Sequence, residues 1–318
     1  MPKKLLRRFA TGAIFAAGLA AARADWPARV FVPYMYLGAD DHFQLTDCDD
    51  ACGQKFYTLA FIIAGEANHP AWDGRFPLED NLYTNQIAVI RARGGEVIAS
   101  FGGEGGKELA LVTTNVDELT AQYAAVTDRY HFTWLDFDVE GRALNNQAAN
   151  RRRNTALAQL QASHPGLRFS YTLPVDPNGI PGSARKLLAD AKAQGVKVYS
   201  ANVMTMDFGT NFSAGKTMAE VSIASALKAH EQCAAIDPAI RIGLTPDIGV
   251  NDVKSEVFTL ADARALEAWA VEQPWVASVS FWCSNRDAGN PGRNGNVRNG
   301  VTKEPWAYTR IFQAFGAK

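Results

Sequence analysis

The sequence predicts an α/β protein built as one (β/α)8 barrel, a TIM barrel, over residues 25–318. Eight short apolar runs rich in β-branched and aromatic residues recur along the chain, with helix-like segments between them. Their near-continuous apolar character is typical of parallel strands covered on both sides. Eightfold alternation of strand and helix favours a closed barrel. The runs cover residues 30–37, 56–63, 96–101, 132–139, 168–173, 196–206, 241–245 and 276–282.

The alternative fold is a doubly wound open sheet, which also alternates strands with helices. Sheets of that kind carry a Gly-rich phosphate-binding turn after the first strand, and no such turn follows residues 30–37. The sequence also contains no internal repeat and no Pro/Ser-rich linker. We therefore expect a single catalytic domain.

Helix start and stop signals lie between the apolar runs. Asn115 precedes Glu118 by three residues, and Thr259 precedes Asp262 by three, which is the spacing of a capping box. Gly195 is suited to a helix C-terminus. Together with the apolar pattern, these signals predict helices over residues 119–130, 183–194, 218–233 and 263–272.

Residues 1–24 resemble a secretory signal peptide. A basic start is followed by an apolar run over 9–22 and by a small-residue cleavage pattern, Ala-Arg-Ala, before Asp25. The alternative is a membrane anchor, but the run is short and rich in Ala and Gly. We expect a secreted or periplasmic monomer with no membrane attachment once the signal is removed.

The charge balance argues against polyanionic partners. Residues 1–24 contain five of the 32 Lys and Arg residues and none of the 33 Asp and Glu residues, so the remaining chain has a formal net charge of −6. An acidic chain does not match nucleic acid or anionic lipid. A neutral substrate is therefore expected, and nucleic acid is not.

Four cysteines lie outside the predicted signal. An exported chain meets an oxidising compartment, so Cys48 and Cys52 are candidates for a local disulfide. The pair lacks the second nearby Cys or His pair that a zinc site needs. Cys233 and Cys283 are expected to be buried free thiols. We predict no metal and no cofactor.

Three acidic residues at the end of the fourth run are the main candidates for chemistry. Asp136, Asp138 and Glu140 are spaced by two, so in a strand their side chains share one face. The residues between them are apolar and need cover, which places the acids inside the barrel near its mouth. Three close carboxyl groups do not all ionise cheaply, so at least one is expected to keep its proton near neutral pH, as a general acid must. The alternatives are an exposed edge strand and a cation site.

Other strand ends place suitable groups at the same end of the barrel, where barrel active sites lie. The third run ends in a Gly-rich segment with Gly102 and Gly103, which allow close backbone approach to a neighbour or ligand. The sixth run ends at Asp207 and the eighth at Trp282. An aromatic side chain there favours a sugar-stacking platform, with core packing as the alternative.

These segments resemble, in order, the signatures of glycoside hydrolase family 18, the chitinase family. The segment Asp136-Phe-Asp-Val-Glu140 resembles the end of its catalytic signature, and Ser100-Phe-Gly-Gly103 resembles its second signature. The remaining matches are Met204-Thr-Met-Asp207, Trp282, and the stretch 243–252, which resembles a bacterial chitinase branch.

The resemblance implies a substrate-assisted retaining mechanism on β-1,4-linked N-acetylglucosamine, as in chitin or its oligomers. Glu140 would protonate the glycosidic oxygen while the substrate's own acetamido carbonyl attacks the anomeric carbon. Asp138 would stabilise the resulting oxazolinium ion, and Asp136 would tune the other two acids. Asp207 would hold the acetamido oxygen above a floor made by Trp282.

Two positions depart from the family pattern. Thr133 replaces an additional Asp, and Met206 replaces a Tyr that helps to hold the acetamido group. That role is then left to Asp207, with another tyrosine such as Tyr171, at the end of the fifth run, as a further candidate. The predicted substrate-binding residues are Asp207, Trp282, Met204, Met206, Tyr171, Gly102, Gly103 and Tyr36. Trp72, Tyr34 and Phe208 are candidates for further subsites, with core packing as the alternative.

Three other functions stay open at this point. One is an endo-acting N-acetylglucosaminidase on glycoprotein glycans. Another is a catalytically silent chitin-binding lectin on the same barrel, although such proteins usually lose the acid that Glu140 supplies. The third is an oxygen-ligand metallohydrolase, which a chelator would inhibit.

Overall fold

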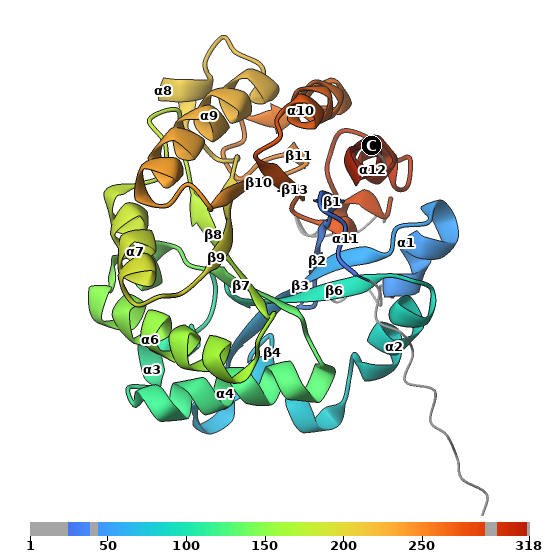
Figure 1. The fold of residues 1–318 in the computed structure, drawn as a ribbon. Coiled ribbons are helices and arrows are strands. Elements are labelled where there is room, and N and C mark those ends of the chain that lie inside the picture. Colours follow the sequence, from blue (N-terminus) through green and yellow to red (C-terminus); the bar gives the residue numbers. More distant parts are fainter. Residues whose placement is uncertain (1–24, 39–43, 290–297, 317–318) are drawn as a thin grey trace, which may run out of the picture.

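A closed barrel of parallel strands lies at the centre of the molecule, with helices around it (Figure 1). The structure is a computed structural model that describes residues 25–38, 44–289 and 298–316 of the 318-residue chain. The barrel strands are β1 (Val30–Phe31), β2 (Tyr34–Tyr36), β3 (Phe56–Ala64), β6 (Glu96–Gly102), β7 (Trp134–Asp138), β8 (Arg168–Pro174), β9 (Val198–Met204), β10 (Arg241–Thr245) and β13 (Val276–Val279). Neighbouring barrel strands pair in parallel, so the predicted (β/α)8 barrel is confirmed.

The first barrel strand is divided into two pieces and closes the barrel. β1 pairs with β13, and β2 pairs with β3. Pro33 stands between the pieces and has no N–H to donate. On either side of it, the backbone N–H groups of Val32 and Tyr34 donate to the carbonyls of Val279 and Phe281, at 2.8 and 3.1 Å. The run predicted at residues 30–37 therefore acts as one strand.

Helices follow the strands and form the outer layer (Figure 1). They are α1 (Leu45–Cys52), α2 (Thr84–Ala92), α3 (Leu109–Val112), α4 (Val116–Tyr130), α5 (Gly141–Asn145), α6 (Gln147–Ser163), α7 (Gly182–Ala193), α8 (Thr210–Ser213), α9 (Met218–Ile236), α10 (Leu260–Glu272), α11 (Ser284–Asp287) and α12 (Ala307–Gly316). The smaller elements are η1 (Glu66–Asn68), β4 (Pro70–Trp72), β5 (Phe76–Pro77), η2 (Leu78–Asp80), β11 (Gly249–Val250) and β12 (Val257–Phe258). β4 and β5 extend β3 as antiparallel strands, and β11 pairs with β12.

Side-chain caps define where the helices begin. The Asn115 carboxamide oxygen accepts a hydrogen bond from the Glu118 backbone N–H, 3.0 Å away, and starts α4. Thr259 and Asp262 form the reciprocal capping box of α10. Both helices begin three residues before their predicted starts, because the first turn lies between the cap and the first core-facing side chain.

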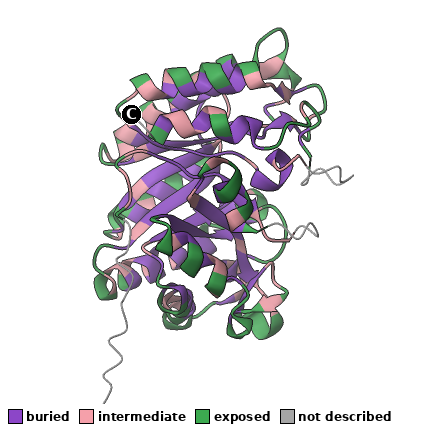
Figure 2. Ribbon diagram, turned by 90° about the vertical axis from the view of Figure 1, so that its right-hand side faces the viewer, coloured by how far each residue is buried: buried purple, intermediate pink, exposed green. Residues whose placement is uncertain are grey.

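The main core lies between the barrel wall and the helices, where the strands and inner helix faces are buried (Figure 2). Outward-facing aromatic rings form much of it on β6 and β7. Phe101 stacks on Phe137 with ring centroids 5.2 Å apart, and Tyr123 of α4 meets both rings edge-on. Since side chains alternate along a strand, this packing directs the neighbours of Phe137 into the barrel.

A buried ion pair anchors the loop after β6. Arg153 of α6 is fully buried and Glu108 nearly so, and Arg153 Nη2 lies 2.8 Å from Glu108 Oε2. The loop between β6 and Glu108 contains the Gly-rich segment predicted for the active site. An unpaired charge at this depth is costly, so the pair holds the far end of that loop against α6.

The candidate disulfide between Cys48 and Cys52 is not formed, whereas the prediction for Cys233 and Cys283 is confirmed. Cys48 and Cys52 are free thiols one helical turn apart on α1, with Sγ atoms 3.3 Å apart. Cys52 instead donates to the Cys48 carbonyl at 3.0 Å, which satisfies it within the helix. Cys233 and Cys283 are buried free thiols, as expected.

The part of the chain that the structure describes shows neither a membrane-crossing helix nor a cluster of metal ligands. None of its helices combines the length and apolar character that a membrane crossing requires. Within the same residues, no cluster of three or more His, Cys, Asp or Glu side chains is arranged to bind a metal. The predicted signal peptide, residues 1–24, lies outside the described residues.

Candidate active site

The acidic column is built by strand β7 and the residues that follow it. Asp136 and Asp138 belong to β7, and both are buried. Glu140 stands at the N-cap of α5 with extended backbone angles, φ −138° and ψ 176°, so the alternation of the strand continues to it. The three carboxyl groups therefore share the inner face, from the barrel interior to the half-buried rim, as the spacing predicts.

Asp136 sits at the deep end of the column in a cradle of hydroxyl groups. It accepts hydrogen bonds from Tyr34 at 3.0 Å, Ser100 at 2.7 Å, Ser170 at 2.6 Å and Thr172 at 3.0 Å. Burial raises the pKa of Asp136, and these hydrogen bonds oppose that rise. Its position is thus defined by four hydroxyl donors from three barrel strands, β2, β6 and β8.

Asp138 is the buried middle member of the column. Burial raises the pKa of Asp138 well above its usual range, and the charges of Glu140 and Asp136 add to the rise. Its side chain hydrogen-bonds with Glu140. Its Oδ1 is buried with no hydrogen-bond partner among the described residues. This direction agrees with the expectation that one acid of the column keeps its proton, and the unpartnered Oδ1 is an acceptor that a ligand can use.

Glu140, the outermost acid of the column, has a pKa near neutrality. Burial raises the pKa of Glu140 to about 7, the negative charge of Glu104 contributes, and the hydrogen bond with Asp138 opposes the shift. A donor is most effective when its pKa lies near the working pH. Glu104 was missed by sequence reasoning, although it lies inside the Gly-rich segment after β6.

Gly102 and Gly103 bring the end of β6 against the end of β7. Gly102 has φ +100°, and a Cβ there would lie 2.1 Å from the Asp138 carbonyl oxygen. Gly103 has φ +86°, and its N–H donates to the same oxygen at 3.1 Å. A Cβ on Gly103 would also clash with the Phe61 ring. These glycines therefore allow close approach to the acid-bearing strand, and any contact with a ligand stays a prediction.

Aromatic rings form a wall beside the carboxyl column. Trp282 stacks on Phe61 with centroids 5.6 Å apart and an interplanar angle of 13°. Tyr34 and Tyr36 lie 5.9 and 5.4 Å from the Trp282 ring. Trp282, Phe61 and Tyr36 are half-buried, so their rings remain accessible at the mouth. Phe61 was missed because an aromatic residue inside an apolar strand is indistinguishable from core in the sequence.

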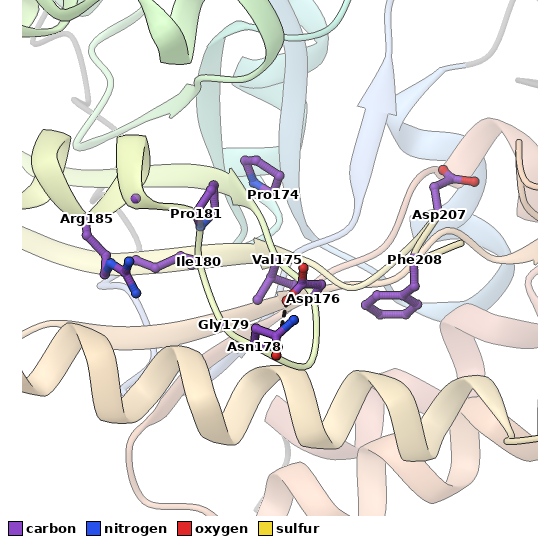
Figure 3. A pocket seen from close by; sticks show the side chains of 11 residues that line it. Pro174, Val175, Asp176, Asn178, Gly179, Ile180, Pro181, Arg185, Asp207 and Phe208 are labelled. Carbon is purple, nitrogen blue, oxygen red and sulfur yellow. Dashed lines mark hydrogen bonds between the residues drawn. The ribbon is translucent and has the colours of Figure 1, made fainter. Parts of the chain in front are cut away.

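Asp207 lies at the rim of a cavity of about 410 Å³ beyond the ends of β8 and β9 (Figure 3). The backbone of Asp207 has φ +49°, and its Oδ1 accepts a hydrogen bond from the Val253 backbone N–H at 2.7 Å. Phe208 lines the cavity, opposite the segment 174–182 (Figure 3). That segment was not singled out from the sequence, because it carries no charged motif.

Tyr171 is not part of the site, which corrects the prediction. It is fully buried, and its hydroxyl donates to Asn154 Oδ1 of α6 at 2.5 Å. Its neighbours Ser170 and Thr172 point inward to Asp136, so alternation turns Tyr171 outward into the helix layer. Trp72 is likewise buried in the core, with its indole N–H donating to Tyr130.

The two methionines predicted to bind substrate are the last residue of β9 and the second residue after it, and their contact with a ligand stays a prediction. Asn202, two residues before Met204, points inward and donates to Thr172 at 2.9 Å. Met204 lies on the same face of β9 as Asn202, and Met206 is two residues further along the chain. Both methionines are half-buried. Thr133, the other departure, accepts from the Trp26 indole at the opposite end of β7, so it does not touch the site.

A barrel whose mouth combines proton-holding carboxyl groups with an aromatic wall is typical of glycoside hydrolases. The comparisons with known proteins agree. The catalytic domain of a hyperthermophilic chitinase from Pyrococcus furiosus is 34% identical, with a TM-score of 0.82 over 92% of this chain and 96% of that one. The chain belongs to the chitinase family of glycoside hydrolases, family 18.

Two curated relatives are longer than this chain. A probable bifunctional chitinase/lysozyme from Escherichia coli is 30% identical over 91% of this chain and 35% of its own length. Endochitinase 11 from Metarhizium anisopliae is 31% identical over 82% of this chain and 53% of its own length. The chain thus spans between a third and about half of these relatives. No family model matches the chain.

Replacing Gly102 with Ala should destabilise the protein by about 1–3 kcal/mol or more, because the new Cβ would press on the Asp138 carbonyl in a backbone region that favours Gly. Urea denaturation measures the effect. Gly105→Ala in the same loop is the matched control, because nothing lies within 4 Å of its added Cβ. Equal stability of the two variants would contradict the close-approach role.

Proposed function

We propose that the chain is a chitinase that cleaves β-1,4 bonds between N-acetylglucosamine units, with Glu140 as the proton donor. The observation that carries this proposal is the half-buried Glu140 carboxyl group, whose pKa is raised to about 7 at the mouth of the barrel. A carboxyl group in this state holds a proton at neutral pH and can give it to a leaving sugar oxygen.

The proton donated by Glu140 allows the glycosidic C–O bond to break. In the substrate-assisted retaining scheme, the acetamido carbonyl oxygen of the substrate attacks the anomeric carbon as the leaving oxygen takes the proton. The resulting oxazolinium ion is opened by water, which the ionised Glu140 deprotonates. Glu140 then has its proton again, and the product keeps the β configuration.

In this scheme, Asp138 would orient the acetamido group. Its buried Oδ1, which has no partner among the described residues, is an acceptor for the acetamido N–H. Positive charge develops on the acetamido group during attack, and this hydrogen bond to Asp138 Oδ1 would stabilise it. The hydroxyl cradle opposes the rise in the pKa of Asp136 that burial causes, which favours a negative charge on Asp136 beneath Asp138.

The substrate class is supported by the mouth and by the relatives. Trp282 and Phe61 offer stacked, half-buried rings for a sugar face. The cavity beside Asp207 is within the size range of small-ligand sites. The relatives are named as chitinases. A domain of a Pyrococcus furiosus chitinase with the same barrel fold was crystallised in complex with chito-oligosaccharides.

Glu140→Gln should lower the turnover of N-acetylglucosamine oligomers by roughly 100- to 10,000-fold, because the proton donor is removed, while oligomer binding persists. Chromatography of products measures turnover, and NMR of fresh products should show the β-anomer. Glu231→Gln, an exposed change on α9, is the matched control. Binding without hydrolysis by the wild type would instead identify a lectin, and glycoprotein glycans as the preferred substrate would identify an endo-N-acetylglucosaminidase.

Activity should fall as the pH rises through about 7, because the raised pKa of Glu140 keeps it protonated only below that value. Glu104→Gln removes a negative charge that raises this pKa, so the basic limb of the kcat/KM profile should move to lower pH. The displacement should shrink at high salt, since Glu104 is exposed. Unchanged profiles for Glu104→Gln at low salt would contradict this assignment.

Export is a further part of the proposal and rests on the sequence of residues 1–24. Expressed with its own N-terminus, the chain should be recovered outside the cytoplasm, starting at Asp25. Subcellular fractionation followed by N-terminal sequencing measures this outcome. Recovery of a cytoplasmic chain that begins at residue 1 or 2 would refute it.

A further inference from the structure

We propose that Arg286, paired with Asp247, is the positioning residue that holds both Trp282 and Asp207 in place at the barrel mouth. Both partners are nearly fully buried and neither belongs to the acidic column. The inference rests on the proposed function, since it assigns a role in the same reaction. Arg286 acts through its neighbours and does not itself contact the reacting atoms.

Arg286 ties together the two ends of the turn after β10. One guanidinium nitrogen, Nη1, donates to Asp247 Oδ1, and Nη2 donates to the Val250 carbonyl at 2.7 Å. The planar guanidinium group can serve both acceptors at once, whereas a lysine ammonium is a single point charge. The turn from Asp247 to Val250 is therefore fixed by one side chain.

The same turn supports Trp282 through its backbone. The Trp282 N–H donates to the Pro246 carbonyl at 2.9 Å, and the Ile248 N–H donates to the Trp282 carbonyl at 3.1 Å. Asp247 and Trp282 thus form an isolated parallel bridge. Because this bridge holds the backbone of Trp282, the orientation of its ring toward Phe61 depends on the position of the turn.

Asp207 is held by the continuation of this segment. Asn251 donates to the Asp247 carbonyl at 2.8 Å, and its Oδ1 accepts from the Asp207 N–H at 3.4 Å. The Val253 N–H donates to Asp207 Oδ1 at 2.7 Å. Asp207 occupies a left-handed backbone conformation that non-glycine residues adopt only under constraint, so the segment 247–253 supplies that constraint.

The residues on either side of Arg286 anchor α11 to the rest of the barrel. Asn285 bonds both the backbone N–H and the carbonyl of Tyr36 through its carboxamide, at 2.8 and 3.0 Å. Asp287 accepts from the backbone N–H groups of Tyr308 and Thr309 at the start of α12, at 3.1 and 2.7 Å. The helix α11 that carries Arg286 is therefore itself held in place. The guanidinium group then links the turn after β10 to this fixed helix.

Arg286→Lys should lower kcat/KM for N-acetylglucosamine oligomers on the order of 100-fold per folded molecule, because Trp282 and Asp207 lose their defined positions. In a Glu140→Gln background, the same change should weaken oligomer binding roughly tenfold by calorimetry. A purely structural role would change the melting temperature and leave this affinity unaltered.

Arg91→Lys is the matched control at the opposite end of the barrel. Arg91 pairs with the buried Glu96 at 2.7 Å and donates to the carbonyls of Tyr130 and His131, so it has the same type of partners. It should lower thermal stability and leave kcat/KM within about twofold of the wild type. Equal effects of Arg91→Lys and Arg286→Lys on activity would overturn the proposal.

Asp247→Asn covers the case in which Arg286→Lys does not fold. Asn keeps an acceptor for the guanidinium but removes the charge, so kcat/KM should fall less than in Arg286→Lys, by roughly tenfold. Wild-type activity from Asp247→Asn would contradict a positioning role for the pair.

The two proposals fail in different ways. An inactive wild type refutes the proposed function, whereas an active wild type with an unaffected Arg286→Lys variant refutes only the positioning role. A crystal structure of Arg286→Lys tests that role independently of activity. Displacement of Trp282 and Asp207 is expected, and an unchanged mouth would overturn the inference.

Discussion

Burial of three carboxyl groups in one column on β7 is the constraint on which the rest of the mouth depends. Such groups are costly to place in a barrel interior unless each is neutral or bonded. The three carboxyl groups lie in different environments along the column. Asp136 is surrounded by hydroxyl groups, the pKa of Asp138 is raised well above its usual range, and Glu140 reaches the half-buried rim with its pKa at about 7. Along the column, the acids thus pass from a fully hydrogen-bonded group to a half-buried one that titrates near neutral pH.

The surrounding elements can be understood from this column. Gly102 lets β6 approach the Asp138 carbonyl, and the buried ion pair of Glu108 with Arg153 anchors the loop that follows. On the other side, α11 and the turn after β10 hold the aromatic wall. The acids therefore stand on a rigid strand, while the groups that would grip a sugar stand on loops fixed by buried polar bonds. This division suits an enzyme whose chemistry requires one fixed donor and a ligand-shaped rim.

The strands and the acids were predictable, but the direction of several side chains was not. Eight apolar runs and a spacing of two were sufficient to place Asp136, Asp138 and Glu140. Tyr171 was assigned to the site because it lies near a strand end. The alternation of side chains along β8 instead turns it outward, where it bonds Asn154 of α6. Phe61 went unnoticed for the reverse reason, since an inward aromatic residue and a core aromatic residue look alike in one sequence.

The sequence by itself determined the alternation along each strand and the residue types at strand ends, because both depend on periodicity over a few neighbours. That local information defined the barrel, the acidic column and the family it resembles. Only the tertiary structure decided how strongly each acid is buried, which charge lies beside it, and which distant segments meet. One example is the charge of Glu104 near Glu140, and another is the hydrogen bond from Arg286 to Asp247. Each brings together residues from separate segments of the chain. Burial and long-range contact set pKa values and positions, and neither is written in local spacing.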